Sequence, residues 1–264
     1  RLGLWAAGSA AGANPNEAAA FKAAQDAITA AGATLVTFDF DHAAEINAFT
    51  AELLILLYEF KFDLQSYLTG RTGVPIHTLA DAIAFNNAHA AAEMPFFGQE
   101  IFEMSQAMDP NPDAPQPQLG GMTYNQAIAT DRKIGGTEGI DKVLHDLNVE
   151  AIVAATANTS WATDLVKGDR PGGYGASTPP AMVGYPIISV PMAMVKGLLP
   201  LGISFFGTAF SEPTLIKLAS GFEHVMQARR EPKFIAEIGL NPQLSSGEQG
   251  DQGGQEGGDR ALVA

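Results

Sequence analysis

Two serines and several histidines are the side chains of this sequence that could support nucleophilic catalysis. The serines are Ser160 and Ser177, and the histidines that could pair with them are His77, His89, His145 and His224. Neither serine lies in a Gly-x-Ser-x-Gly turn, which exposes the nucleophile of many hydrolases between a strand and a helix. No histidine is three or four residues from another, the spacing that places two metal ligands on one helix face. The sequence therefore predicts neither a serine–histidine hydrolase nor a metal centre.

Lysine could replace histidine as the base, and a glycine-rich segment could hold the serine. Lys61 lies in an amphipathic stretch and Lys196 in a Val-Lys-Gly-Leu turn, so we expect both ammonium groups to be solvated. The glycine-rich segment 172–178 lacks paired serines and precedes Pro179-Pro180. We interpret it as a loop; the alternative, in which Ser177 lines an acyl pocket, stays open.

The elements that must position these residues follow an α/β pattern. An apolar run at 2–5, a helix at 17–31 that begins after Asn14-Pro15-Asn16, and a strand at 33–40 predict a strand, helix, strand unit. Further helices are predicted at 43–68, 79–92, 99–108, 124–147 (with a possible break at Gly135-Gly136) and 211–229, and further strands at 149–155, 186–191 and 201–206.

The ends of the elements and of the fold can be placed in the same way. Pro186 and Pro191 are expected at the two ends of a buried strand, because proline is not tolerated in its middle. The proline-rich stretch 109–118 is expected to be a surface loop. We predict one folded part over 1–239 and a disordered Gly, Gln and acidic tail over 240–264, which has too few apolar residues to offset its ordering entropy.

The composition excludes several classes of partner. The chain has 15 basic and 29 acidic residues, a formal net charge of -14, so we expect no nucleic acid and no membrane surface as a partner. The apolar run 53–58 is too short to span a bilayer. The absence of cysteine fits a reducing compartment, and we expect a cytoplasmic protein.

Several segments, in their order along the chain, resemble the C-terminal region of the amidase-signature family. The most specific are Gly184–Met192, Leu201–Gly207 and Glu212–Leu215, supported by Phe97–Glu100 and Asp81–Asn86. The resemblance implies a part of an α/β/α fold with a mixed central sheet flanked by helices. It also implies hydrolysis or transfer of amide groups by a nucleophilic serine, a second serine in a cis peptide bond and a lysine, with no metal or organic cofactor.

In that family the lysine and both serines precede the strand, helix, strand unit with which this chain begins. We therefore expect the catalytic residues upstream of Arg1 and expect this chain alone to be inactive. The resemblance implies that the segment after strand 149–155 approaches the substrate pocket, so Thr156, Asn158 and Trp161, with Ser177, are the predicted substrate-binding residues. An aromatic ring and a primary amide suit a partly apolar acyl group with one polar contact.

Three interpretations of the whole chain remain open at this point. It can be the C-terminal part of an amidase that acts on a small-molecule amide, or a non-catalytic module that binds a small molecule or a partner chain. It can also complete an active site together with an N-terminal half. A cut through a large sheet would leave strand edges uncovered, so we expect poor solubility or a homo-oligomer when the chain is alone.

Overall fold

The computed structural model describes residues 1–5, 14–117, 119–166, 168 and 173–232. Contacts divide the chain after Arg229, and the description below concerns the unit Arg1–Arg229. The predicted disordered tail, 240–264, lies outside the described residues. Among the described residues, no helix combines the length and the apolar character that crossing a bilayer requires.

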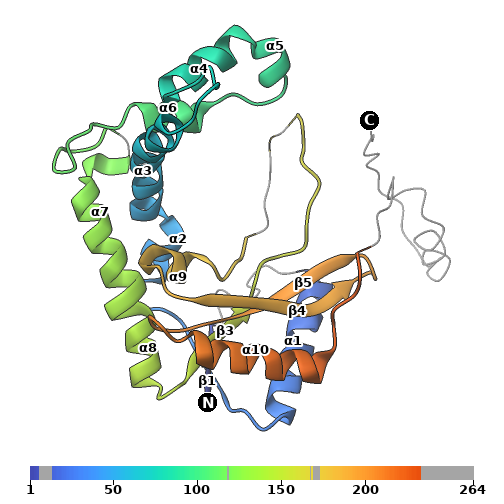
Figure 1. The fold of residues 1–264 in the computed structure, drawn as a ribbon. Helices are drawn as coiled ribbons and strands as arrows, with labels where there is room; N and C mark the ends of the chain where they lie inside the picture. Colours follow the sequence, from blue (N-terminus) through green and yellow to red (C-terminus); the bar gives the residue numbers. More distant parts are fainter. Residues whose placement is uncertain (6–13, 118, 167, 169–172, 233–264) are drawn as a thin grey trace, which may run out of the picture. The chain divides into compact units, whose positions relative to one another are not determined.

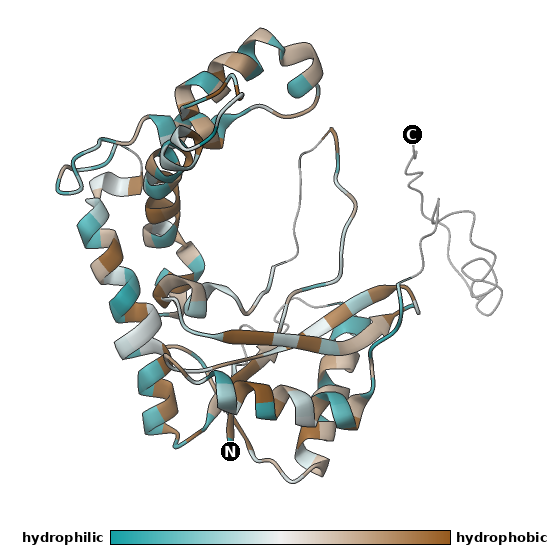
Figure 2. Cartoon of the chain, viewed as in Figure 1, coloured by the Kyte–Doolittle hydropathy of each residue, from teal (hydrophilic) through white to brown (hydrophobic). Residues whose placement is uncertain are grey.

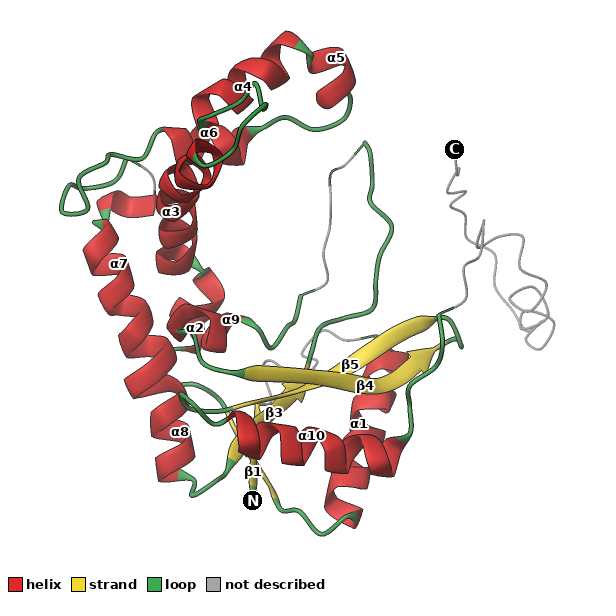
Figure 3. Cartoon of the chain, viewed as in Figure 1, coloured by secondary structure: helices red, strands yellow, loops and turns green. Residues whose placement is uncertain are grey.

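A five-stranded mixed sheet is the centre of this unit (Figure 1; Figure 3). Its strand order is β2 (Leu35–Phe38), β1 (Leu2–Trp5), β3 (Ala151–Ala155), β5 (Leu199–Phe206) and β4 (Ile187–Val195). β1 is parallel to both β2 and β3, whereas β5 is antiparallel to β3 and β4. The predicted α/β class with a mixed sheet is confirmed, and helices flank the sheet on both faces.

Helices α1 (Pro15–Ala30) and α10 (Glu212–Met226) cover one face of the sheet (Figure 1). Asn14 caps α1, and Glu17 completes a capping box by accepting from the Asn14 backbone N–H. Figure 2 shows hydrophobic and hydrophilic residues mixed along α10. The hydrophobic ones recur every three or four residues and therefore form one side of the helix, which packs on the sheet. Phe21 of α1 and Phe222 of α10 belong to this buried cluster.

The other face is covered by α2 (Ala43–Ala48), the π-helical segment η2 (Arg132–Ile140) and α9 (Thr178–Val183). Trp5 and Phe206 point to this face, where their rings meet edge to face with centroids 6.4 Å apart. Alternation along the strands thus gives the sheet two separate apolar faces.

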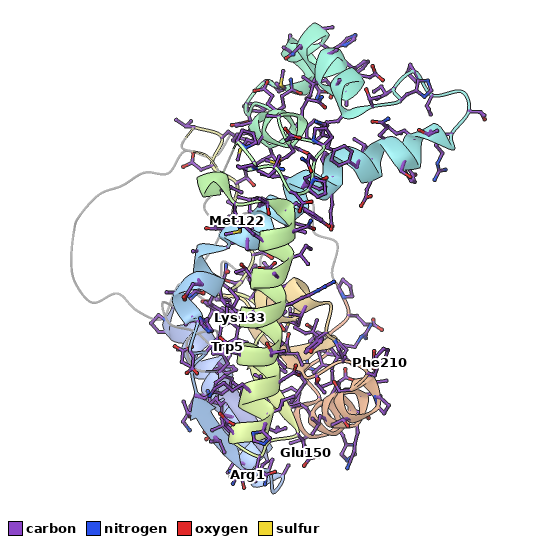
Figure 4. The ribbon with its side chains drawn as sticks, turned by 90° about the vertical axis from the view of Figure 1, so that its left-hand side faces the viewer. Arg1, Trp5, Met122, Lys133, Glu150 and Phe210 are labelled. Carbon is purple, nitrogen blue, oxygen red and sulfur yellow. The ribbon has the colours of Figure 1, made fainter. Side chains whose placement is uncertain are left out.

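The predicted helix 124–147 forms a column of three segments, α7 (Tyr124–Asp131), η2 and α8 (Asp141–Asp146), which runs from Met122 past Lys133 toward Glu150 (Figure 4). The α-helix changes to a π-helical segment at Arg132, so the predicted Gly135-Gly136 pair lies inside the irregular segment, and the residue with non-helical φ and ψ is Gly139. A Cβ at Gly139 would lie 2.3 Å from a backbone carbonyl oxygen, so only glycine fits there.

The predicted helix 43–68 is divided. Phe49 has a left-handed φ of 57° and separates α2 from α3 (Thr50–Thr69). The remaining helices of this region are α4 (Leu79–Ala88), α5 (Ala90–Glu93), α6 (Glu100–Gln106) and the short 3₁₀ helix η1 (Leu119–Gly121). The spacing of apolar residues therefore predicted that this region is helical, but it did not predict where one helix ends and the next begins.

The expectation of a solvated Lys61 is wrong. Its Nζ donates to the carbonyl oxygens of Gln106 and Met108, at 2.9 and 2.7 Å, and so satisfies carbonyl groups at the end of α6. Lys196 is exposed, as expected. The loop 109–118 is also not wholly superficial, because Gln116 is buried and its Oε1 accepts from the backbone N–H of Asp109.

The expected role of Pro191 is also corrected. This proline lies within β4, where the pairing with β5 shifts between Pro191 and Ala193. β4 is at the end of the strand order, so the proline's missing N–H can face away from the ladder. An edge strand with a bulge tolerates proline where a central strand would not.

Candidate substrate-binding site

The predicted binding segment begins where β3 ends, and its backbone is held on two sides. The N–H of Thr156 donates to the carbonyl of Gly202 at 2.9 Å, and the carbonyl of Thr156 accepts from Ala176 at 3.0 Å. Ala157 and Gly175 form an antiparallel bridge. The loop after β3 and the segment leading to Ser177 therefore lie side by side, which brings two of the predicted site segments together.

Three hydroxyl groups support this loop from the sheet. Thr156 Oγ1 lies 2.7 Å from Ser204 Oγ, which lies 2.8 Å from Ser189 Oγ. Ser204 is fully buried, so its two partners satisfy a group that water does not reach. A Cβ at Gly202 would lie 2.7 Å from Thr156 Oγ1, so glycine permits this close approach. The hydroxyl trio thus joins β4 and β5 to the start of the loop.

A buried carboxylate holds the next part of the loop. Glu17 is 4% exposed, and its Oε1 accepts from Thr159 N at 2.9 Å and from Thr159 Oγ1 at 2.6 Å. Burial alone would raise the pKa of Glu17, but hydrogen bonds from Thr159, Asn14 and Tyr174 outweigh it and lower that pKa. Burial and the charge of Glu17 raise the pKa of Tyr174 to about 12. Glu17 is therefore a fixed negative charge that ties the loop to the start of α1.

The four predicted residues differ in how they are presented. The Asn158 Nδ2 donates to the carbonyl of Thr159 at 2.9 Å, which leaves its Oδ1 and a second N–H to contact a ligand. Trp161 is 47% exposed. Ser177 is exposed at the start of α9, where its side chain makes no capping hydrogen bond.

No hydrolytic machinery is assembled among the described residues. His42 binds Glu138 and Glu45, His89 binds the Phe85 carbonyl, and His145 binds Asp146. Across residues 1–5, 14–117, 119–166, 168 and 173–232, no hydrogen bond joins a lysine or histidine side chain to a serine hydroxyl. No group of three potential metal ligands occurs in that part of the chain either.

One further polar group is chemically unusual. Asp131 of α7 is 1% exposed, and neither of its carboxylate oxygens has a hydrogen-bond donor among the described residues. Burial, with a smaller contribution from the neighbouring Glu52 carboxyl, raises the pKa of Asp131 to about 8. Glu52 also lines a cavity of about 150 Å³ next to Thr130. Asp131 therefore keeps its proton at neutral pH, next to the Glu52 carboxyl group.

The sequence did not indicate Ser189, Ser204, Asp131 or the contact of Glu17 with the loop. A glutamate three residues after an Asn cap is a signal for the capping box, so the local sequence indicates the first role of Glu17, at the start of α1. Its second role depends on a residue 142 positions away. Ser204 could have been noticed as a polar residue inside an otherwise apolar strand.

The sequence comparison finds amidases. The chain is 34% identical over 189 residues to the Arabidopsis thaliana protein "Probable amidase At4g34880", a match that covers 71% of this chain and 31% of that protein. No protein-family model matches the chain. The chain thus spans about a third of the length of this curated relative.

The structural comparison finds the same family. The peptide amidase from Stenotrophomonas maltophilia is 34% identical with a TM-score of 0.73, and the match covers 89% of this chain and 44% of that one. An amidase family protein from Bacillus anthracis shares the fold, with a TM-score of 0.66 at 21% identity over 88% of this chain and 40% of that one. These comparisons identify the chain as part of an amidase-signature protein, in agreement with the predicted C-terminal portion.

Proposed function

We propose that this chain contributes the substrate-binding part of an amidase that hydrolyses the carbon–nitrogen bond of a small amide. The observation that carries the proposal is the loop 156–161 after β3, which is fixed by Glu17 and by the Ser204 hydroxyl. A loop held by buried hydrogen bonds can present side chains to a ligand with little loss of conformational entropy.

The binding residues have complementary chemistry. Trp161 offers an aromatic surface to the acyl group, Asn158 offers an amide oxygen, and Ser177 offers a hydroxyl from the adjacent segment. Thr156 has its hydroxyl bonded to Ser204, so its part is to position the loop. Contacts of this kind select and orient an amide, but they do not break its bond.

Cleavage of an amide also needs an activated nucleophile, a base and donors for the oxyanion. We propose that these groups come from the part of the relatives' length that this chain does not span. In the amidase-signature family they are two serines and a lysine, and a desolvated neutral lysine can accept the proton of the nucleophile through the bridging serine. No metal or organic cofactor is needed for this chemistry.

The part of the relatives' fold that this chain does not span is also the proposed partner for the exposed surface of this chain. Among the described strands, β2 and β4 each pair on one side only. Large apolar side chains are exposed on the helical region, among them Leu56, Phe85, Phe96 and Ile101. Contact with an N-terminal half, or with a second copy when that half is missing, would cover such surface. We place this amidase in the cytoplasm, because a cysteine-free chain suits a reducing compartment.

A chimeric enzyme tests the proposal. The matching segment of the Stenotrophomonas maltophilia peptide amidase is replaced by residues 1–229 of this chain, and hydrolysis of aliphatic, aromatic and peptide amides is measured. We expect Trp161→Ala to raise KM about tenfold with a smaller change in kcat, and Trp161→Phe to recover most of the loss.

The control is Tyr67→Ala, which removes another exposed aromatic ring, on α3, and should leave KM unchanged. Equal effects of Trp161→Ala and Tyr67→Ala, or an effect on kcat alone, would contradict a substrate-binding role for the loop. A folded chimera with no activity on any amide would contradict the proposed function as a whole.

A further inference from the structure

A second cavity lies between α1 and α10, on the face of the sheet that these helices cover, and it is open to solvent: Ala31, Lys217, Gly221 and Val225 line it and are exposed. Its volume is about 310 Å³, and it is lined by α1, by α10 and by the strand residues Leu2 and Phe205. Phe205 belongs to the apolar cluster under α1 and α10, whereas the next residue back, Ser204, bonds to Thr156 on the other face. The loop 156–161 is held by Glu17 at the start of α1, whereas the cavity is lined by Ala27, Ile28 and Ala31 at the end of that helix, so the two sites are separate.

Small residues keep the cavity open. Ala27 and Ala31 line it from the end of α1, and Gly221 lines it from α10. A Cβ built on Gly221 would meet no atom within 4 Å, although this residue is inside a helix where glycine is unfavourable. A side chain at this position would therefore extend into empty space without a clash.

The cavity wall is apolar apart from one charge. Of the residues that line it, only Lys217 is charged. Among the described residues, no carboxylate forms an ion pair with Lys217. Asp26, which precedes Ala27 on α1, is already paired with Lys22. Lys217 is exposed, so its aliphatic stem lines the cavity while its ammonium group can reach solvent at the cavity's edge.

We propose that this cavity binds a small apolar molecule that carries a carboxylate, with the apolar part between α1 and α10 and the carboxylate next to Lys217. A volume of 310 Å³ is at the lower end of the range for ligand pockets and suits a molecule of about ten non-hydrogen atoms. The apolar walls supply burial of the hydrocarbon part. The ammonium group sets the preference for an anionic head over a neutral or cationic one.

The test uses the whole chain and octanoate as the probe, with binding measured by calorimetry and by shifts of the Leu and Ala methyl signals in NMR spectra. Gly221→Leu fills the cavity and should weaken octanoate binding more than tenfold, while the replacement of glycine inside a helix keeps or increases stability. Gly221→Ala is the matched control, since it adds one methyl group and should change binding less than twofold. Lys217→Met should weaken octanoate about threefold, the size expected for an exposed charge.

Binding of octylamine and octanol tests the preference for a carboxylate separately from the binding of the apolar chain. We expect octanoate to bind more tightly than octanol, and octanol more tightly than octylamine, with Lys217→Met removing this order. Octanoate binding that is absent, or that is unchanged by Gly221→Leu, would overturn the site. Equal binding of octylamine and octanoate would overturn the assignment of a carboxylate ligand. None of these results depends on amidase activity, so the proposal stands or falls separately from the proposed function.

Discussion

Replacement of Asp131 by asparagine should make the protein more stable at alkaline pH. The carboxyl group is buried between α3 and α7 without a donor, and burial next to Glu52 raises its pKa to about 8 from an ordinary value of 3.8. The folded protein thus holds this proton more tightly than the unfolded chain does, and unfolding releases it. The free energy of unfolding must therefore fall as the pH rises from about 4 to about 8.

The size of the effect follows from the same pKa. Between pH 5 and pH 8 the group alone would remove up to about 4 kcal/mol from the free energy of unfolding, at 1.36 kcal/mol for each tenfold change in proton concentration. We expect about half of this, roughly 2 kcal/mol, because helices α3 and α7 can separate slightly and admit water. Asp131→Asn keeps the shape of the side chain and should abolish this contribution.

Urea unfolding of both proteins at pH values from 5 to 9 measures the effect. His42 also loses a stabilising charge over this range, because its hydrogen bonds to Glu138 and Glu45 raise its pKa, but it does so equally in both proteins. The difference between them therefore isolates Asp131. Asp63→Asn, which removes an exposed carboxylate of α3, is the control and should follow the wild type. Parallel curves for Asp131→Asn and the wild type would refute the reasoning.

Three further substitutions test the supports of the fold and of the loop. Glu17→Gln removes a charged acceptor of several hydrogen bonds and should lower the free energy of unfolding by about 1–3 kcal/mol. In the Trp5→Phe background it should also change the fluorescence of Trp161. Unchanged stability and fluorescence would contradict the role of Glu17. Ser204→Ala removes the shared partner of the Thr156 and Ser189 hydroxyl groups, which are not fully buried, and should cost about 0.5–1.5 kcal/mol in urea unfolding. A cost near zero would show that the hydroxyl trio does not stabilise the loop. Gly139→Ala should lower the thermal midpoint by several degrees, since its Cβ would lie 2.3 Å from a carbonyl oxygen, whereas Gly70→Ala, with 3.9 Å to the nearest atom, should change it little; equal midpoints would show that the π-helical segment relaxes freely.

Most of the fold could be predicted from the spacing of apolar residues and from helix-capping signals. The apolar spacings predicted the strand, helix, strand unit, the later strands and α10, because these patterns reflect which face of an element is buried. They did not predict the breaks at Phe49 and Gly139, where tertiary packing imposes a backbone conformation that local propensity does not specify. Pro191 was misplaced because the rule against proline in strands holds for central strands, and the sequence does not tell which strand is at an edge.

The supports of the candidate site were harder to predict than its segments. The family resemblance indicated the loop 156–161 and the segment that contains Ser177, and the structure brings these two segments together. Glu17 and Ser204 act through partners 142 and 48 positions away, and a single sequence contains no signal for such pairings. The contacts of Lys61 could not be predicted for the same reason, because its carbonyl partners, Gln106 at the end of α6 and Met108 after it, are 45 and 47 positions away. Long-range polar contacts are therefore what the structure adds to the sequence.

We propose that this chain binds an amide substrate and that the catalytic residues lie in the part of its relatives that it does not span. The most direct test incubates the chain with a fluorophosphonate probe for activated serines and with a panel of aliphatic and aromatic amides, after circular dichroism has shown that the protein is folded. We expect no labelled serine and no turnover by the folded chain. Labelling of Ser160, Ser177 or any other serine, together with amide hydrolysis, would contradict it.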